Sequence, residues 1–265
     1  MHYSIASTSR IPGDEELGGQ AGMDSLPFVM KLVRTEKQLQ KVCELRSVAY
    51  GHHLPHLAAP LRIPDPLDRA PGTVVFLAED KLTGEAIGTA RLQSNTHQPL
   101  LLEASVDIPG ELKRQALTEI TRFSVRPGYN QFSTRQALIK ACYLYCCAMQ
   151  LPTILIGARR PLDRIYESLG YVDLFGDGRK IPLKHAGGIE HRVLKFDVYG
   201  AERNWHAQQH PLYQFMFRTH HPDIQVFSTI SAGWSRPRRA PQAAVGIIDR
   251  GRLAKGKWAA RTDSN

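Results

Sequence analysis

An acidic and a basic side chain lie three residues apart in the stretch LTEITRFSVRPG, residues 117–128. The stretch alternates in polarity like a β-strand, which places Glu119 and Arg122 inside a sheet. Burial there raises the pKa of a carboxyl group towards neutrality, where it can take a proton from a reacting amine. We expect Glu119 to be the general base and Arg122 to neutralise buried charge. The alternatives are a structural Glu119 paired with a core arginine, and an Arg122 that contacts substrate.

Four more charged residues precede this strand in short, distinct contexts. They are Arg46 in ELRSVAYG, Asp65 and Asp68 in DPLD, and Arg91 in GEAIGTARL. Guanidinium groups bind carboxylates through charge-assisted, often bidentate hydrogen bonds. Such a network would fasten the loop that carries DPLD as a gate over the site. Alternatively, one carboxylate binds an acceptor's ammonium group and one arginine binds its carboxylate.

Hydrophobic periodicity predicts the elements that position these residues. Strands are predicted at 28–35, 73–80, 85–93, 117–128, 151–159 and 191–199. Helices are predicted at 36–51, 133–150 and 161–170, with Ser133 as the N-cap of the second. A long loop over 51–72 holds five prolines, and a polar connection spans 93–117. This order predicts an α/β (α+β) fold with a mixed central sheet flanked by helices.

The 265 residues suit one domain with loose ends. We expect a flexible leader over 1–26, a catalytic domain over 27–200, an extension with a helical piece over 201–231, and a disordered tail over 232–265. The tail carries eight Lys and Arg against two Asp, which is six of the nine net positive charges. A basic tail suits an anionic membrane surface or an acidic protein; nucleic acid is the least expected partner.

The composition also bears on the cellular compartment of the protein and on whether it binds a metal. No apolar run reaches the length of a membrane helix, and the first residues lack the basic and apolar regions of a secretory signal. We therefore expect a cytoplasmic protein. The four cysteines form no CxxC pair, so they are predicted to be apolar packing residues, and no metal site is expected.

The order of elements resembles the GNAT acyl-CoA N-acyltransferase fold, and RIYESLGY at 164–171 resembles the helix and turn that follow its fifth strand. The series of an Arg on the first helix, a DxxD, an Arg that closes a hairpin strand, and ExxRF-V resembles the acyl-homoserine-lactone (autoinducer) synthases and the related long-chain N-acyl amino acid synthases. This resemblance covers about residues 28–200 and implies an acyltransferase that acts on an amine with a thioester donor.

Two departures from these families bear on which acyl donor and which acceptor the protein uses. The stretch VRPGYNQFSTRQAL has one glycine, Gly128, where acetyl-CoA-dependent relatives have a glycine-rich loop for the pyrophosphate. The donor is therefore expected to be the acyl-phosphopantetheine of acyl carrier protein, with acyl-CoA as the alternative, and no cofactor is expected to stay bound. Residues 51–64 lack the tryptophan of the autoinducer synthases. An amino acid is accordingly favoured over S-adenosylmethionine as the acceptor.

The resemblance also assigns roles to further residues. A bulged fourth strand would turn the backbone N–H groups of Phe123, Ser124 and Val125 towards the thioester. A basic face would steer the acidic carrier protein; its residues would be Arg126, Arg135, Arg159 and Arg160. Apolar residues of 137–149 and 153–158 would form the wall of an acyl tunnel.

These inferences predict an N-acyltransferase that moves a long-chain fatty acyl group from acyl carrier protein to the α-amine of an amino acid. Two alternatives stay open. One is an acyl-homoserine-lactone synthase that uses S-adenosylmethionine. The other is a catalytically silent GNAT-like module that binds partners.

Overall fold

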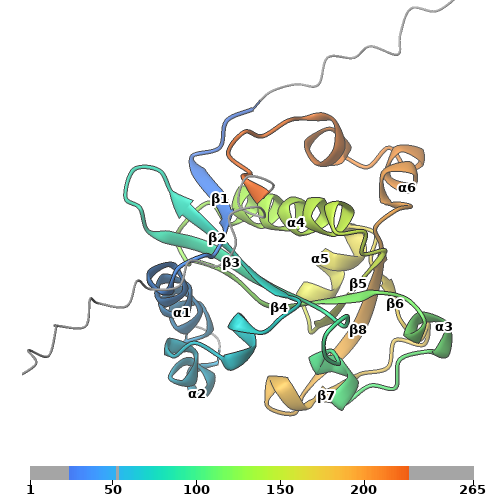
Figure 1. Cartoon of the computed structure of the whole chain (residues 1–265). Coiled ribbons are helices and arrows are strands. Elements are labelled where there is room, and N and C mark those ends of the chain that lie inside the picture. Colours follow the sequence, from blue (N-terminus) through green and yellow to red (C-terminus); the bar gives the residue numbers. More distant parts are fainter. Residues whose placement is uncertain (1–23, 52–53, 227–265) are drawn as a thin grey trace, which may run out of the picture. The chain divides into compact units, whose positions relative to one another are not determined.

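A mixed sheet lies at the centre of the described part of the chain (Figure 1). The computed structural model describes residues 24–51 and 54–226. Eight strands follow the order β1-β2-β3-β4-β5-β8-β6, with β7 paired to β8. Among these strands, β4 and β5 pair in parallel and the other pairs are antiparallel. The strands are β1 (Phe28–Leu32), β2 (Thr73–Asp80), β3 (Ala86–Ser94), β4 (Leu117–Val125), β5 (Thr153–Ala158), β6 (Val172–Asp173), β7 (Ile181–Leu183) and β8 (Ile189–Asp197).

Helices cover both faces of this sheet. The α-helices are α1 (Glu36–Gly51), α2 (Pro55–Ala58), α3 (Gly110–Lys113), α4 (Gln131–Ala148), α5 (Leu162–Ser168) and α6 (Ala201–Ala207). Shorter turns are the 3-10 helices η1 (Pro60–Arg62), η2 (Pro66–Arg69), η3 (Leu101–Ala104) and η4 (Lys184–Ala186), and the π-helix η5 (Gln214–Arg218). No helix within the described residues combines the length and apolar character needed to cross a membrane.

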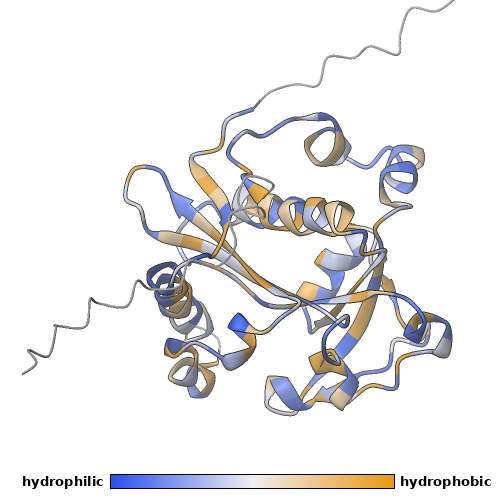
Figure 2. Cartoon of the chain, viewed as in Figure 1, coloured by the Kyte–Doolittle hydropathy of each residue, from blue (hydrophilic) through white to orange (hydrophobic). Residues whose placement is uncertain are grey.

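The sheet separates three apolar clusters, because neighbouring residues of a strand point to opposite faces. The largest lies under α4 and includes Phe76 and Ile120. The opposite face carries two smaller clusters, one under α1 with Leu77 and one around η3 with Leu117 and Leu155. Figure 2 shows hydrophobic residues concentrated on the strands and on α4. Buried polar residues, including Arg91 and Glu119, lie between the two smaller clusters on that second face.

The predicted helix 36–51 is confirmed, and the two hairpin strands differ from their predicted bounds by one residue at most. The predicted N-cap of the second long helix is wrong. Helix α4 begins at Gln131, and the N-cap is Asn130, whose side-chain oxygen accepts a hydrogen bond from the Ser133 N–H at 3.3 Å. Either side chain could cap a helix; Asn130 stands three residues before the N–H that needs an acceptor.

The two predicted connections contain structure that periodicity did not indicate. Residues 51–72 hold α2, η1 and η2, each with a proline in its first turn, where the fixed φ of proline suits helix initiation. The connection 93–117 is not simply polar: it contains η3 and α3 and buries four apolar side chains, Leu100, Leu102, Val106 and Ile108. Strands β6 and β7 are two and three residues long, too short for a periodic signal.

The predicted leader and tail fall mainly beyond the described residues. Only 24–26 of the leader 1–26 are described, and the whole tail 232–265 lies outside. The extension that begins at 201 contains α6 and η5, and Trp205, Met216 and Ile224 belong to the main core cluster. The predicted packing role of the cysteines is confirmed: all four are free, and Cys43, Cys142 and Cys146 are buried.

Candidate active site

Strand β4 carries a bulge in the middle of the sheet. Thr89 of β3 lies opposite Ser124, but Arg91 lies opposite Thr121, so β4 has one extra residue there. Arg122 adopts a left-handed conformation with φ of 54°. Strand β4 pairs with β5 only as far as Ile120, and the two strands separate beyond it. The bulge that the resemblance implied is confirmed, and the structure also shows the separation of β4 from β5.

The separation leaves backbone donors of β4 without a β5 partner. The N–H of Arg126 donates to the carbonyl oxygen of Ile87 at 2.8 Å. Because donors alternate between the two edges of a strand, the N–H of Ser124 also points towards β3. By the same alternation the N–H groups of Phe123 and Val125 point to the open side. Of the three amides expected at the thioester, that of Ser124 is therefore directed elsewhere.

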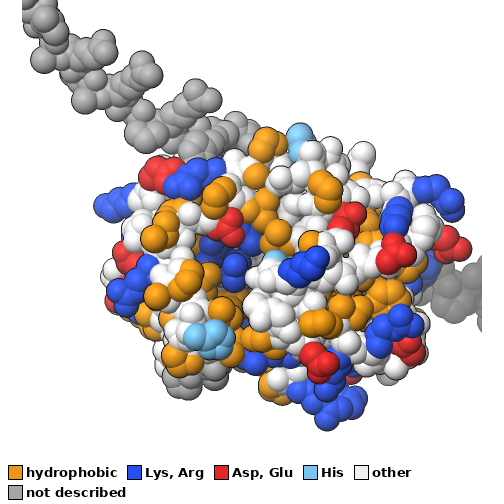
Figure 3. Space-filling view, turned by 90° about the horizontal axis from the view of Figure 1, so that it is seen from below, with side chains coloured by type: hydrophobic (Ala, Val, Ile, Leu, Met, Phe, Trp, Pro, Cys, Tyr) orange, Lys and Arg blue, Asp and Glu red, His pale blue; other side chains and the backbone are white. Residues whose placement is uncertain are grey.

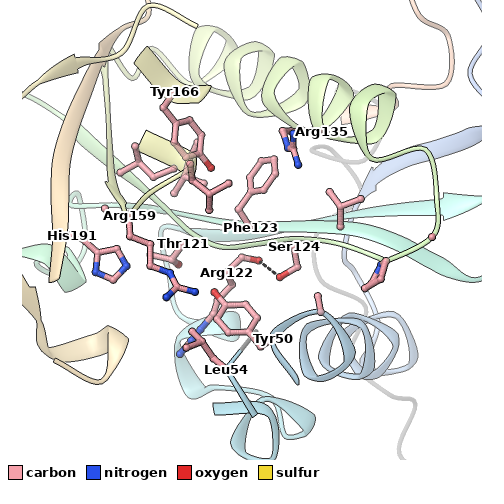
Figure 4. Close-up of a pocket in the computed structure, with 18 residues that line it drawn as sticks. Tyr50, Leu54, Thr121, Arg122, Phe123, Ser124, Arg135, Arg159, Tyr166 and His191 are labelled. Carbon is pink, nitrogen blue, oxygen red and sulfur yellow. Dashed lines mark hydrogen bonds between the residues drawn. The ribbon is translucent and has the colours of Figure 1, made fainter. Parts of the chain in front are cut away.

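A cavity of about 600 Å³ opens where the strands separate (Figure 4). It passes between the two faces of the sheet: Phe123, Tyr166 and Arg135 lie on the α4 side, whereas Arg122 and Arg159 lie on the other. The remaining lining residues include Ala49, Tyr50, Leu54, Ile120, Thr121, Ser124, Val125, Pro127, Gly128, Ile156, Gly157, Leu162 and His191. Among the described residues that line the cavity, none is acidic.

The α4 side of the cavity is aromatic. The rings of Phe123 and Tyr166 meet edge to face with centroids 6.5 Å apart. The expected tunnel wall is only partly present: Ile156 of 153–158 lines the cavity, but the apolar residues of 137–149 do not. Side chains such as Leu138 and Cys142 pack in the main core instead.

The four charged residues of the predicted network meet on the α1 face. Nη1 of Arg46 donates to both carboxylate oxygens of Asp68, at 3.0 and 2.9 Å. Nη1 of Arg91 contacts Asp65 at 3.0 Å and Asp68 at 3.4 Å. Arg46, Asp68 and Arg91 are fully buried, whereas the side chain of Asp65 is 37% exposed. None of the four lines the cavity.

This network fastens η2 to the sheet and to α1. The Asp65 side chain accepts from the Leu67 N–H, and the Asp68 side chain accepts from the Asp65 N–H, which forms a capping box. Burial opposes ionisation of Asp65, but hydrogen bonds from Leu67 and Arg91 lower its pKa. The arrangement has the contacts that the gate interpretation requires.

Glu119 lies behind the cavity rather than in its lining. Its side chain is fully buried, and Oε2 accepts from the Leu102 N–H at 3.0 Å. Burial raises the pKa of Glu119 to about 7, against the opposing effects of the Leu102 N–H and of Arg91. Within residues 24–51 and 54–226, Arg122 makes no ion pair with it.

His185 of η4 is a candidate site residue that the sequence did not reveal. Its Nε2 lies 3.5 Å from Oε1 of Glu119, an oxygen that otherwise has no hydrogen-bond partner among the described residues. Burial, then the charge of Arg122, lowers the pKa of His185 to about 4, so its imidazole is neutral at pH 7. The surrounding segment has no periodicity, and no motif marked this histidine.

The four arginines expected to contact a carrier protein do not share one environment. Arg135 and Arg159 line the cavity. Nε of Arg126 donates to the Ala86 carbonyl oxygen at 2.9 Å, and the side chain of Arg160 is 71% exposed. No group of three or more His, Cys, Asp or Glu side chains in the described part of the chain is placed to hold a metal ion.

Known proteins resemble this chain in sequence and in structure. A family model described as N-acyl amino acid synthase FeeM matches residues 41–187. The solved structure of FeeM, an N-acyl amino acid synthase from uncultured soil microbes, is 14% identical with a TM-score of 0.53. The matched region covers 71% of this chain and 98% of the FeeM chain. No curated protein matches.

Two further solved structures are similar at lower scores. The CoA-dependent acyl-homoserine lactone synthase BjaI, with SAM and isopentyl-CoA, is 15% identical with a TM-score of 0.49, over 73% of this chain and 93% of its own. An acyl-CoA N-acyltransferase from Pseudomonas aeruginosa is 16% identical with a TM-score of 0.45, over 63% and 98%.

The likeness to FeeM shows that the mixed sheet is a GNAT-like fold, as predicted. The family model spans more than half of the 265 residues and includes the bulged strand, the charged network and His185. The chain therefore belongs to the FeeM family of N-acyl amino acid synthases and is an acyltransferase.

Proposed function

We propose that this protein transfers a long-chain fatty acyl group from the phosphopantetheine arm of acyl carrier protein to the α-amine of an amino acid. The observation that carries the proposal is the cavity through the separated strands. Its α4 side is aromatic and apolar, which suits an acyl chain, and its charged residues are all basic, which suits an anionic acceptor. Such a reaction would take place in the cytoplasm.

The chemistry is attack of a neutral amine on the thioester carbonyl. The amine nitrogen forms a bond to the carbonyl carbon and then loses a proton, which the departing sulfur takes. The tetrahedral oxyanion accepts a hydrogen bond from the N–H group of Phe123 or of Val125. Collapse breaks the carbon–sulfur bond. The thiolate leaves and takes that proton, and the product is an amide.

Glu119 is the base that removes the ammonium proton in this proposal. With its pKa raised to about 7, it is half ionised near neutral pH, where a general base works best. Neither Glu119 nor His185, whose Nε2 lies 3.5 Å from Oε1, lines the cavity, so the proton reaches Glu119 through a relay that includes water. Arg122 acts on this relay by its charge, which helps to keep His185 neutral.

Acyl carrier protein is the proposed donor because the turn before α4 contains a single glycine, Gly128. A pyrophosphate cradle of backbone N–H groups needs several close backbone approaches, which usually require more than one glycine. The phosphopantetheine arm has one phosphate, and Arg135 on the α4 side of the cavity can bind it. In this proposal Arg160, whose side chain is 71% exposed, contacts the acidic surface of the carrier protein.

The cavity lining favours an amino acid over S-adenosylmethionine. The latter carries a sulfonium cation, and a cavity with three arginines and no acidic lining residue among those described would repel it. The uncharged wall formed by Tyr50 and Leu54 instead suits an acceptor with a neutral side chain.

The test is mass spectrometry of lipid extracts from cells that express the wild type or Glu119→Gln. The proposal predicts an N-acyl amino acid with the wild type and a loss of about 10²–10⁴-fold in the variant, which is the range of general base catalysis. Unchanged amounts with Glu119→Gln would rule out the proposed base. The same species in cells without the protein would remove the evidence for the reaction.

A further inference from the structure

Two arginines on the α1 side of the cavity have no assigned partner. We propose that Arg122 and Arg159 bind the α-carboxylate of the acceptor and so define it as a free amino acid. The inference rests on the proposed function and adds the recognition site to it.

The two guanidinium groups lie in a cavity without a counter-charge. Neither forms an ion pair within the described residues, whereas Arg46, Arg91 and Arg192 each pair with a carboxylate. Nε of Arg122 is buried and has no hydrogen-bond partner there. Unpaired buried donors are costly, and two positive charges that face one cavity repel each other. An anion between them would remove both costs.

One carboxylate that feels the charge of Arg122, that of Asp65, already has partners. The charge of Arg122 acts on Asp65, but Oδ2 of Asp65 is bound by Arg91 at 3.0 Å and Oδ1 by the Leu67 N–H at 2.9 Å. His191, which also lines the cavity, has its pKa lowered by burial and by Arg159, and it supplies no negative charge. Because no acidic side chain among the described residues lines the cavity, we infer that the anion comes from a ligand.

The position of the two arginines identifies the acceptor as that ligand. Arg122 and Phe123 point to opposite faces of the sheet, and Figure 4 shows Arg159 on the Arg122 side. Figure 3 shows Lys and Arg side chains in a recess bordered by hydrophobic ones. In an amino acid, one carbon separates the amine from the carboxylate. A carboxylate held by Arg122 therefore places the amine beside the strand that presents the Phe123 and Val125 N–H groups.

A phosphate of the donor is the competing ligand for these charges. Its expected place is the opposite side of the sheet, where Arg135 extends from α4. The test must therefore separate the acceptor's carboxylate from the donor's phosphate.

The experiment compares an amino acid with the amine that remains when its carboxylate is removed. Wild type, Arg159→Gln and Arg122→Gln are assayed with both acceptors at saturating acyl carrier protein thioester. Each variant is expected to lower kcat/KM for the amino acid by about 10- to 100-fold, the effect of a lost hydrogen bond to a charged group. For the amine, the loss in kcat/KM should be at least about tenfold smaller than for the amino acid, and the KM for the donor should not change.

Arg164→Gln is the matched control, because Arg164 is an arginine on α5 that is 66% exposed and does not line the cavity. Arg159→Gln keeps the test valid if Arg122→Gln disturbs the bulge. Equal losses for the amino acid and the amine would contradict the inference. A raised KM for the donor alone would assign the two arginines to phosphate.

Calorimetric titration of the amino acid into the protein without donor separates the two levels of the proposal. Binding that needs both the carboxylate and Arg159, in a protein that transfers no acyl group, would support the recognition site and contradict the proposed reaction. Acyl transfer with the same amino acid-to-amine preference in wild type and Arg159→Gln would support the reaction and contradict the recognition site.

Discussion

At the scale of single residues, the site depends on a carboxyl group kept out of water. The sequence predicted that Glu119 would be buried, because it lies within an alternating strand. It could not predict the two partners: the Leu102 N–H belongs to a connection without periodicity, and His185 lies in a short 3-10 turn. Contacts between segments so distant along the chain depend on the tertiary fold, which a local pattern does not describe.

The raised pKa of Glu119 makes stability depend on pH. Between the ordinary value of 4.5 and about 7, the folded protein holds a proton that the unfolded chain has released. The free energy of unfolding of the wild type should therefore fall as the pH rises through this window. Glu119→Gln removes the titration, so the stability of the variant relative to wild type should rise by about 3 kcal/mol from pH 4 to 8. Urea unfolding at a series of pH values measures the difference in the free energy of unfolding between the variant and the wild type. A difference that does not change with pH would contradict the raised pKa of Glu119.

At the scale of elements, long periodic segments were predicted well. Helix α1 has the predicted bounds, because its apolar residues recur over four turns. The proline-rich stretch 51–72 predicts a loop, because proline breaks the interior of a helix. In the structure, however, three of its prolines begin α2, η1 and η2. The charged network was predicted as a set, but which pairs form depends on how η2 packs against α1 and β3.

Asp68 should be the most sensitive member of that network. Asp68→Asn would leave Arg46 and Arg91 buried without their shared carboxylate, at a cost of about 3–5 kcal/mol in the free energy of unfolding. Asp107→Asn is the control, because the Asp107 side chain is 92% exposed and pairs with Lys113 on the surface, where the effect should stay below about 1 kcal/mol. Chemical denaturation of the two variants tests this, and equal losses would contradict a buried network.

Lys140 of α4 should anchor the segment around η5. Its Nζ donates to the carbonyl oxygens of Phe215 and Thr219, both at 2.6 Å. Lys140→Met would leave these oxygens unsatisfied, and we expect a loss of about 2 kcal/mol with faster amide exchange over 214–219. Lys37→Met on the exposed face of α1 is the control. Exchange in 214–219 that is the same in both variants would contradict the anchoring role.

At the scale of the whole molecule, the fold class followed from the element order, whereas the position of Glu119 relative to the cavity did not. A register shift and a strand separation decide which residues of β4 line the cavity, and neither has a local signature. The extension after 200 likewise had no strong pattern, but Trp205, Met216 and Ile224 are buried in the main core.

This packing predicts where the chain can be shortened. A chain that ends at 231 should keep its stability and acyl transfer, because every described residue remains. A chain that ends at 200 should lose Trp205 and Met216 from the core and fail to fold, since each large buried side chain contributes about 2–5 kcal/mol. Circular dichroism with thermal unfolding measures the folding and stability of the two shortened chains. Loss of activity on removal of 232–265 alone would show that the basic tail is needed for the reaction.

The central claim is amide formation between an acyl chain and an amino acid, and one measurement tests it most directly. Purified protein is incubated with long-chain acyl carrier protein and an isotopically labelled amino acid, and the products are analysed by mass spectrometry. The account predicts a product that contains both the acyl chain and the label, at a yield that falls in Arg159→Gln. Intact or merely hydrolysed thioester, with no labelled amide from the folded wild-type protein, would contradict it.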